Sequence, residues 1–449
     1  MEKQSTNARK PKMQHSTPAR NWVGDNGKII EPLFADYFLS LHPMRCFQGR
    51  LFTVDGMVED EAPLKKEIYE QIRYYATTSV ARRIEHIMQA IKLACASDPP
   101  EIQTDRIHVR NGTYFVGGHF TPEKEYCMNR LPIAYVSDAS APTRWLQFLI
   151  ELLYEEDIPA LQEYIGYCLL PVTKAQKMLL MVGKGGEGKS RIGLILRELF
   201  GSSMYTGSLQ KVETNRFARA DLEYKLLLVD DDMKTEALPQ TNNIKTLVTL
   251  EDKIDIERKG QQSVQGTLYV RFACFGNGSL HALYDKSNGF YRRQLLLTTK
   301  EKPVGRVDDP FLIDKMRNEK EGILLWALEG LHRLIRNNYR FTISERTAAN
   351  LKEAMEQGNN ILGFLKSEGY FEIRQGAKCK STDFYKVYER WCLDNLEKPL
   401  AASTFIHHLK DNQKSLGIVY DDKCIGTNRG FHNVDVDLFL PVDVPSPWD

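Results

Sequence analysis

The sequence predicts an α/β protein whose central part holds a mostly parallel sheet. Between about residues 175 and 300, short apolar runs alternate with helical patterns, which is typical of consecutive βαβ units. Within this stretch, a glycine-rich loop joins an apolar run directly to a helical pattern. The chain has 449 residues, enough for about three domains. We therefore expect further domains on both sides of the sheet.

Composition limits the classes of protein to consider. Hydrophobic residues make up 42% and charged residues 27% of the chain, which excludes disorder for most of it. No apolar run approaches the roughly 18 residues of a membrane span, and no apolar segment typical of secretion follows Met1. We therefore expect a cytoplasmic protein without a membrane partner. The eight cysteines form no C-x-x-C pair, which argues against a zinc site or a disulfide framework. Because the net charge is +1, nucleic-acid binding would need local basic patches.

Two regions are expected at the N-terminal side. Residues 1–20 carry five Lys or Arg against one Glu and predict a disordered basic tail, with a weak DNA-touching arm as the alternative. Residues 21–135 predict an α+β domain. It would hold one or two helices over 63–97 and a hairpin over 107–116, with Asn111-Gly112 as the turn.

Helical and compact segments flank the predicted sheet. Residues 136–174 are strongly helical and would form a segment just before the core. Residues 175–340 would form the core itself, which includes one more helical stretch over 312–335. Residues 345–449 predict a compact C-terminal domain.

The sharpest motif is a glycine-rich loop that fits G-x-x-x-x-G-K-[ST] at every fixed position. An apolar run over 178–182 precedes it and a helical pattern over 191–200 follows it, which argues against a chance match. Backbone N–H groups in such a loop, together with the helix N-terminus, bind phosphate. Lys189 is expected to reach the β- and γ-phosphates of ATP, and the Ser190 hydroxyl to ligate Mg²⁺. The predicted ATP-binding residues are Gly183, Lys184, Gly185, Gly186, Glu187, Gly188, Lys189, Ser190 and Arg191.

A second apolar run ends in the acidic residues Asp230, Asp231 and Asp232. In a parallel sheet, the carboxyl ends of strands carry the ligand chemistry. One carboxylate would hold Mg²⁺, and the next would orient and deprotonate the attacking water. We assign Asp230 to the metal and Asp231 to the water, with a shift by one residue as the alternative.

Two further polar features complete the predicted catalytic set. A third apolar run leads to Asn277, whose amide would position water against the γ-phosphate; an ordinary Asn-Gly turn is the alternative. Arg292 and Arg293 stand just before another apolar run. They predict either a solvated face or an arginine finger that reaches the ATP of a neighbouring subunit, which is worth roughly 10³–10⁵ in rate.

In this order, the loop, the Asp run, Asn277 and the paired arginines resemble the Walker A, Walker B, sensor 1 and arginine finger motifs of the superfamily 3 (AAA+) helicases. The chain is most similar to the helicase module of the phage, plasmid and poxvirus primase–helicase proteins, over about residues 105–440. Two departures stand out. The Walker B position has three Asp and no Glu, and the residues ahead of this region are too few for a primase.

The resemblance implies an AAA+-like P-loop ATPase core and a C-terminal winged-helix domain. It also implies a homo-hexameric ring on single-stranded or forked DNA, with ATP at the subunit interfaces. Such a ring would work in a bacterial host cytoplasm beside a separate primase or polymerase. A hairpin between the Asp strand and the sensor strand would enter the central channel. The candidate spans 254–268, with Arg258 and Lys259 as DNA contacts near its tip; an ordinary charged hairpin is the alternative.

The leading hypothesis is therefore an ATP-dependent DNA helicase for replication of a phage, plasmid or other mobile element. The alternative is an origin-binding ATPase that melts DNA without processive unwinding. A small-substrate phosphotransferase is disfavoured, because such an enzyme needs neither a basic hairpin nor a separate C-terminal domain.

Overall fold

The computed structural model describes residues 21–76, 78–233, 241–277, 288–303, 305–358, 360–397, 399–436 and 439. The chain divides into two compact units, one ending at Arg130 and one beginning at Leu131. The predicted basic tail over 1–20 lies outside the described residues. The other predicted domain boundaries stay predictions. Across the described ranges, no helix is both long and apolar enough to cross a membrane.

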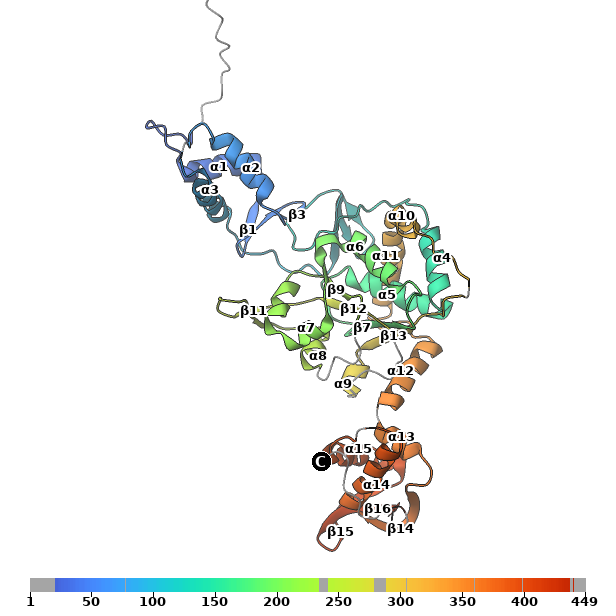
Figure 1. Ribbon diagram of the computed structural model, residues 1–449. Coiled ribbons are helices and arrows are strands. Elements are labelled where there is room, and N and C mark those ends of the chain that lie inside the picture. Colours follow the sequence, from blue (N-terminus) through green and yellow to red (C-terminus); the bar gives the residue numbers. More distant parts are fainter. Residues whose placement is uncertain are drawn as a thin grey trace, which may run out of the picture. The chain divides into compact units, whose positions relative to one another are not determined.

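The first unit combines three helices with two small antiparallel sheets (Figure 1). Its helices are α1 (Glu31–Leu41), α2 (Ala62–Ile72) and α3 (Val80–Ala94). One sheet has the order β1 (Arg45–Phe47), β2 (Arg50–Thr53), β3 (Gly56–Met57), and the other has the order β4 (Arg106–Val109), β5 (Gly112–Phe115), β6 (Phe120–Thr121). Trp22, Phe34 and Phe38 from the start of the unit pack with Ile68 and Ile91 in its core. The helical pattern over 63–97 is thus two helices.

The hairpin β4–β5 is confirmed, but its predicted turn is shifted by one residue. Val109 pairs with Gly112, so the two loop residues are Arg110 and Asn111, and Gly112 begins β5. A Cβ at Gly112 would lie 2.1 Å from the Thr121 carbonyl oxygen. Glycine is therefore required by the close approach of the next strand, rather than by the turn.

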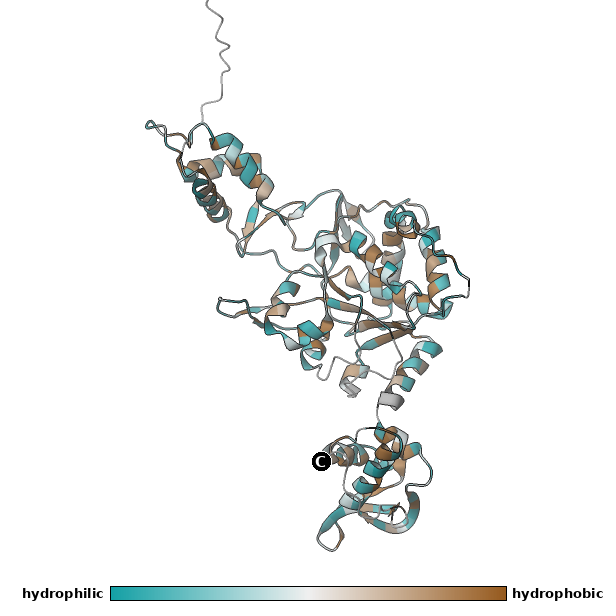
Figure 2. Cartoon of the chain, viewed as in Figure 1, coloured by the Kyte–Doolittle hydropathy of each residue, from teal (hydrophilic) through white to brown (hydrophobic). Residues whose placement is uncertain are grey.

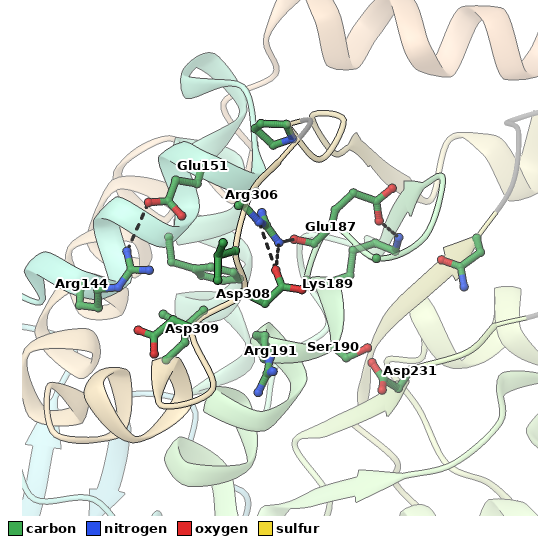
Figure 3. A pocket seen from close by; sticks show the side chains of 17 residues that line it. Arg144, Glu151, Glu187, Lys189, Ser190, Arg191, Asp231, Arg306, Asp308 and Asp309 are labelled. Atoms are coloured by element: carbon green, nitrogen blue, oxygen red, sulfur yellow. Dashed lines mark hydrogen bonds and ion pairs between the residues drawn. The ribbon is translucent and has the colours of Figure 1, made fainter.

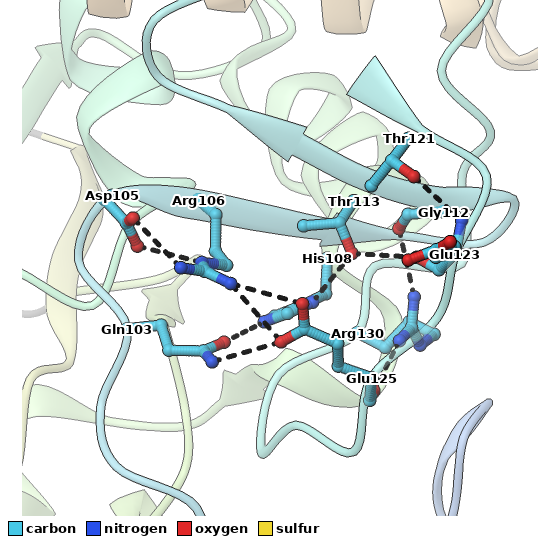
Figure 4. Close-up of polar contacts among 10 residues, drawn as sticks. All are labelled: Gln103, Asp105, Arg106, His108, Gly112, Thr113, Thr121, Glu123, Glu125 and Arg130. Atoms are coloured by element: carbon cyan, nitrogen blue, oxygen red, sulfur yellow. Dashed lines mark hydrogen bonds and ion pairs between the residues drawn. The ribbon is translucent and has the colours of Figure 1, made fainter. Parts of the chain in front are cut away.

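A buried polar network holds this sheet together (Figure 4). His108 is 6% exposed, and its Nε2 lies 2.6 Å from Gln103 Oε1. Arg130 donates to the carbonyl oxygens of Val109, Gly112 and Glu125. Burial lowers the pKa of His108 to about 4, and the nearby Arg130 charge adds to the effect. His108 is therefore neutral at physiological pH and serves the fold.

The second unit contains a five-stranded parallel sheet in the order β13-β7-β12-β9-β8. The strands are β7 (Met178–Gly183), β8 (Met204–Thr206), β9 (Leu227–Asp230), β12 (Arg271–Asn277) and β13 (Gln294–Thr298). The residues of β7, β9, β12 and β13 are nearly all buried because helices cover both faces, and Figure 2 shows the central strands as strongly hydrophobic. The prediction of an α/β core with a parallel sheet is confirmed. Since the strands are parallel, the carboxyl ends of β7, β9 and β12 meet at one edge of the sheet.

Helices pack on the sheet through alternate residues of the strands. On one face, Leu180, Phe272 and Leu296 pack with Leu209 and Ile244 from the helical segments below them. On the other face, Gly193 of α6 lies close to Phe275 and Val229. The helices and short 3-10 turns from residue 131 to the end of the core are α4 (Thr143–Leu152), η1 (Glu155–Asp157), α5 (Ile158–Cys168), α6 (Lys189–Phe200), η2 (Gly201–Ser203), α7 (Leu209–Thr214), η3 (Arg216–Leu222), α8 (Asn242–Val248), α9 (Asn288–Tyr291), α10 (Leu312–Arg317), α11 (Lys320–Arg336) and α12 (Glu345–Gly358).

The stretch 312–335, predicted as helical, holds two helices. It divides into α10 and α11 at Asn318 and Glu319, and the Glu319 carboxylate accepts from the Arg144 and Trp145 amides. That carboxylate caps the N-terminus of α4, where orphan N–H groups and the helix dipole favour an anion. Glu319, between α10 and α11, therefore caps the start of α4.

Two further groups of elements complete the chain. A hairpin of β10 (Ile254–Ile256) and β11 (Val264–Gly266) lies between α8 and β12. The C-terminal segment holds α13 (Asn360–Lys366), β14 (Glu372–Lys380), α14 (Ser381–Asp394), α15 (Ala402–Asp411), α16 (Gln413–Leu416), β15 (Val419–Ile425) and β16 (Asn428–Asp435). Its antiparallel sheet has the order β14-β16-β15, and its core gathers the rings of Phe364, Phe384, Tyr388 and Phe405. The winged-helix assignment of this segment stays a prediction.

Candidate functional site

A cavity of about 630 Å³ lies at the carboxyl edge of the parallel sheet (Figure 3). The loop from Gly183 to Gly188 joins β7 to α6 and forms one wall. Asp231 and Asn277, which follow or end β9 and β12, form another. The lining residues are Arg144, Phe148, Glu151, Gly186, Glu187, Gly188, Lys189, Ser190, Arg191, Asp231, Asn277, Pro303, Arg306, Val307, Asp308, Asp309 and Leu312.

The glycines of the loop give it a backbone path that other residues rarely adopt. Gly185, Gly186 and Gly188 have φ angles of +106°, +81° and +117°. These left-handed conformations need glycine. The helix α6 begins at Lys189, directly after Gly188, so its N-terminus points its unpaired N–H groups toward the loop.

Lys189 is held by an acidic residue of its own loop. Its Nζ donates to Glu187 Oε2 at 2.8 Å, and the Gly185 N–H donates to Glu187 Oε1 at 2.7 Å. Burial would raise the pKa of the Glu187 carboxyl, but the Lys189 ammonium and backbone N–H donors lower it below its usual value. Lys184, by contrast, is exposed and pairs with Glu301 outside the cavity.

The two aspartates at the end of β9 face different surroundings. Asp231 is exposed and lines the cavity, and Figure 3 shows its carboxylate beside the Ser190 hydroxyl. Asp230 is buried, and its Oδ2 accepts from the Leu209 N–H at 2.7 Å, at the start of α7. Burial raises the pKa of Asp230, although the hydrogen bond from Leu209 opposes this shift. Of the two aspartates, Asp231 is therefore the one that lines the cavity, whereas Asp230 faces α7.

Asn277 lies at the carboxyl edge of the sheet, beside the glycine loop. It ends β12, pairs in register with Gly183, and lines the cavity. A Cβ at Gly185 would be 3.7 Å from Asn277 Oδ1, so the amide stands against the loop backbone.

The basic and acidic residues at the other end of the cavity were not among the predicted site residues. Arg144 of α4 pairs with Glu151 at 3.4 Å. Arg306, from the segment after β13, donates to the Glu187 carbonyl oxygen at 3.1 Å and pairs with Asp308. The one available signal was the run of charged residues between about 300 and 309, directly after a predicted strand.

Arg292 and Arg293 lie at the opposite edge of the sheet. Gln294, the next residue, pairs with Met178 at the start of β7, whereas the loop begins at Gly183. Five strand residues at about 3.3 Å each separate the two ends by roughly 16 Å. Arg292 is exposed, and Arg293 lines a separate cavity of about 480 Å³ beside α8. Burial lowers the pKa of Arg293, helped by the charge of Arg292. Neither arginine lines the 630 Å³ cavity beside the glycine loop.

The hairpin β10–β11 has the predicted form, but its two predicted DNA contacts differ in exposure and in ion pairing. Arg258 is paired with the buried carboxylate of Glu223, which ties the hairpin to the segment after η3. Lys259 is exposed, next to Gly260 at φ +75°. Of the predicted pair, Lys259 is the residue presented at the tip.

Comparisons with known proteins found one family model and several similar solved structures. A family model described as a family of unknown function (DUF5906) matches residues 181–293, the stretch from β7 to the paired arginines. None of the curated proteins matches the chain. The apo structure of the NrS-1 C-terminal region is 13% identical, with a TM-score of 0.50, and covers 90% of this chain and 99% of that one. Two A-form apo structures of the same region are 12% identical, with TM-scores of 0.49 and 0.47. They cover 90% and 87% of this chain, and 99% and 88% of theirs. At this identity the likeness concerns the fold alone.

Proposed function

We propose that the chain is an ATP-dependent DNA helicase that serves the replication of a phage, plasmid or other mobile element. The observation that carries the proposal is the split arrangement of charged groups on one sheet. The glycine loop, Ser190, Asp231 and Asn277 surround one cavity at the carboxyl edge. Arg292 and Arg293 stand at the amino edge.

The cavity fits a nucleoside triphosphate with Mg²⁺. The Ser190 hydroxyl and the Asp231 carboxylate are hard oxygen ligands of the kind Mg²⁺ takes. The ion would neutralise charge that develops on the phosphoryl group. Asn277 would hold the attacking water, and Lys189 would bind the terminal phosphates.

The distance between the two edges of the sheet supports a ring assembly. Because the arginines cannot reach the cavity of their own chain, their use as a finger requires a neighbour. A homo-hexamer with one nucleotide at each interface would meet this requirement. Its channel would carry single-stranded or forked DNA along Lys259, and a winged-helix C-terminal domain would add contacts to duplex DNA. A separate primase or polymerase would then complete replication.

The experiment compares Lys189→Ala with the wild type in ATP hydrolysis and in strand separation on a forked duplex. Lys211→Ala, an exposed lysine of α7, is the control variant. We expect both activities to vanish in Lys189→Ala and to persist in the control. Retained turnover in Lys189→Ala would refute the nucleotide site. Turnover without unwinding in the wild type would favour the origin-melting ATPase instead.

A further inference from the structure

The Glu187 carboxylate occupies the interior of the loop that carries it. Its two oxygens accept from the Gly185 N–H at 2.7 Å and from Lys189 Nζ at 2.8 Å. The Glu187 and Lys189 side chains are only 3% and 6% exposed. A loop backbone N–H and the loop lysine are also the donors that a bound phosphate needs. The side chain and a phosphate group therefore compete for the same donors.

The surroundings are shaped to keep the carboxylate in this place. A Cβ at Gly183 would lie 2.9 Å from Glu187 Oε1 and 2.9 Å from Lys189 Nζ, so glycine is the residue that leaves room for the pair. Arg306 donates to the Glu187 carbonyl oxygen and holds the backbone from the other side. The ion pair is thus a packed part of the loop, unlike the exposed pair of Lys184 and Glu301.

We propose that Glu187 acts as an intramolecular substitute for a phosphate group and sets which phosphate ligands the loop accepts. This inference rests on the proposed nucleotide site. Each ligand would first have to displace the carboxylate, so the apparent affinity is reduced by the free energy that holds Glu187 in place. A triphosphate, which adds contacts to Mg²⁺ and the rest of the cavity, overcomes this reduction. A single anion such as inorganic phosphate does not.

The decisive variant is Glu187→Gln, which removes the charge and keeps the shape of the side chain. Its affinity is measured by calorimetry on the full chain with Mg²⁺–ATP, tripolyphosphate and inorganic phosphate. We expect ATP and tripolyphosphate to bind about tenfold tighter, equivalent to about 1.4 kcal/mol. Inorganic phosphate should gain measurable binding. Glu301→Gln is the matched control, because it removes the same charge from a carboxylate that also pairs with a loop lysine but is exposed.

The outcomes separate the inference from the proposed function. Unchanged or weaker binding in folded Glu187→Gln overturns the inference, and so does an equal gain in Glu301→Gln. Glu187→Ala, as a second variant, should change affinity in the same direction. An experimental structure of the wild type with an ATP analogue should show Glu187 moved off Lys189. A carboxylate still at about 3 Å from Nζ beside a bound phosphate refutes the substitution. If neither the wild type nor the variants bind ATP or tripolyphosphate, the proposed function fails as well.

Discussion

Replacing the two neighbouring aspartates one at a time should separate stability from catalysis. Asp230 is 6% exposed and accepts from the N–H of Leu209, which is itself fully buried. A hydrogen bond to a charged acceptor contributes roughly 1.5–3 kcal/mol, and its loss would leave a buried N–H without a partner. Asp230→Ala should therefore destabilise the protein by about 2 kcal/mol. At about 2 °C per kcal/mol for a large domain, Tm falls by roughly 4 °C.

The matching substitutions at both positions sharpen this test. Asp230→Asn keeps an oxygen that can accept from Leu209 and loses the buried charge, so Tm should stay within about 2 °C of the wild type. Asp231→Asn should leave Tm unchanged, because the side chain is exposed. Its kcat should fall at least about 100-fold, as expected when a group that stabilises the transition state is lost.

The assay pairs thermal unfolding with ATP hydrolysis at saturating Mg²⁺–ATP. Folded Asp230→Asn should keep turnover within about threefold of the wild type, since its carboxylate faces α7 rather than the cavity. The reasoning is refuted if Asp230→Asn loses turnover at an unchanged Tm while Asp231→Asn keeps it. That result would support Asp230 as the Mg²⁺ ligand.

Three further predictions follow from the same geometry. Arg293→Ala should lose ATP hydrolysis but bind ATP normally. Mixing this variant with Lys189→Ala should restore part of the turnover. If no mixing ratio restores turnover, an arginine finger acting between subunits is contradicted. Lys259→Ala should keep basal ATPase, lose unwinding and reduce the salt slope of single-strand DNA binding by about 0.7 per lost contact. Arg258→Ala should instead loosen the hairpin, because it removes the ion pair with Glu223, and amide exchange over 254–266 would show this. Because the pKa of His108 is about 4 when folded and about 6.5 when unfolded, the unfolded state binds more protons between these values. Amide protection in β4 and β5 should therefore fall as pH drops from 6.5 toward 4, and His108→Gln should flatten this dependence.

The sequence predicted those parts of the site that follow one another along the chain. The strand, loop and helix around Lys189 were predictable because apolar periodicity and the glycine pattern are local signals. Which of Asp230 and Asp231 lines the cavity was not predictable, because successive strand residues face opposite sides and a sequence does not reveal which side meets the loop.

Contacts between distant segments were missed for a different reason. Arg306 reaches the loop backbone from more than a hundred residues downstream, and Arg258 meets Glu223 of a neighbouring segment. Nothing in the local pattern of either arginine distinguishes it from a solvated surface charge. The turn at Gly112 was misplaced likewise, since the constraint comes from Thr121 on another strand.

The adjacent carboxylates at the end of β9 also make this strand a mechanical junction. Asp231 faces the cavity, while Asp230 accepts a hydrogen bond from the N–H of the first residue of α7. At the far end of α7, Glu213 accepts from the amides of Asn243 and Ile244 and so grips the start of α8, which leads into the hairpin. The first turns of α7 and α8 are thus each hydrogen-bonded to a carboxylate of the preceding element, Asp230 at the end of β9 and Glu213 in α7. Under the proposed function, a shift of the end of β9 on nucleotide binding would be transmitted through α7 and α8 to the hairpin that carries Lys259.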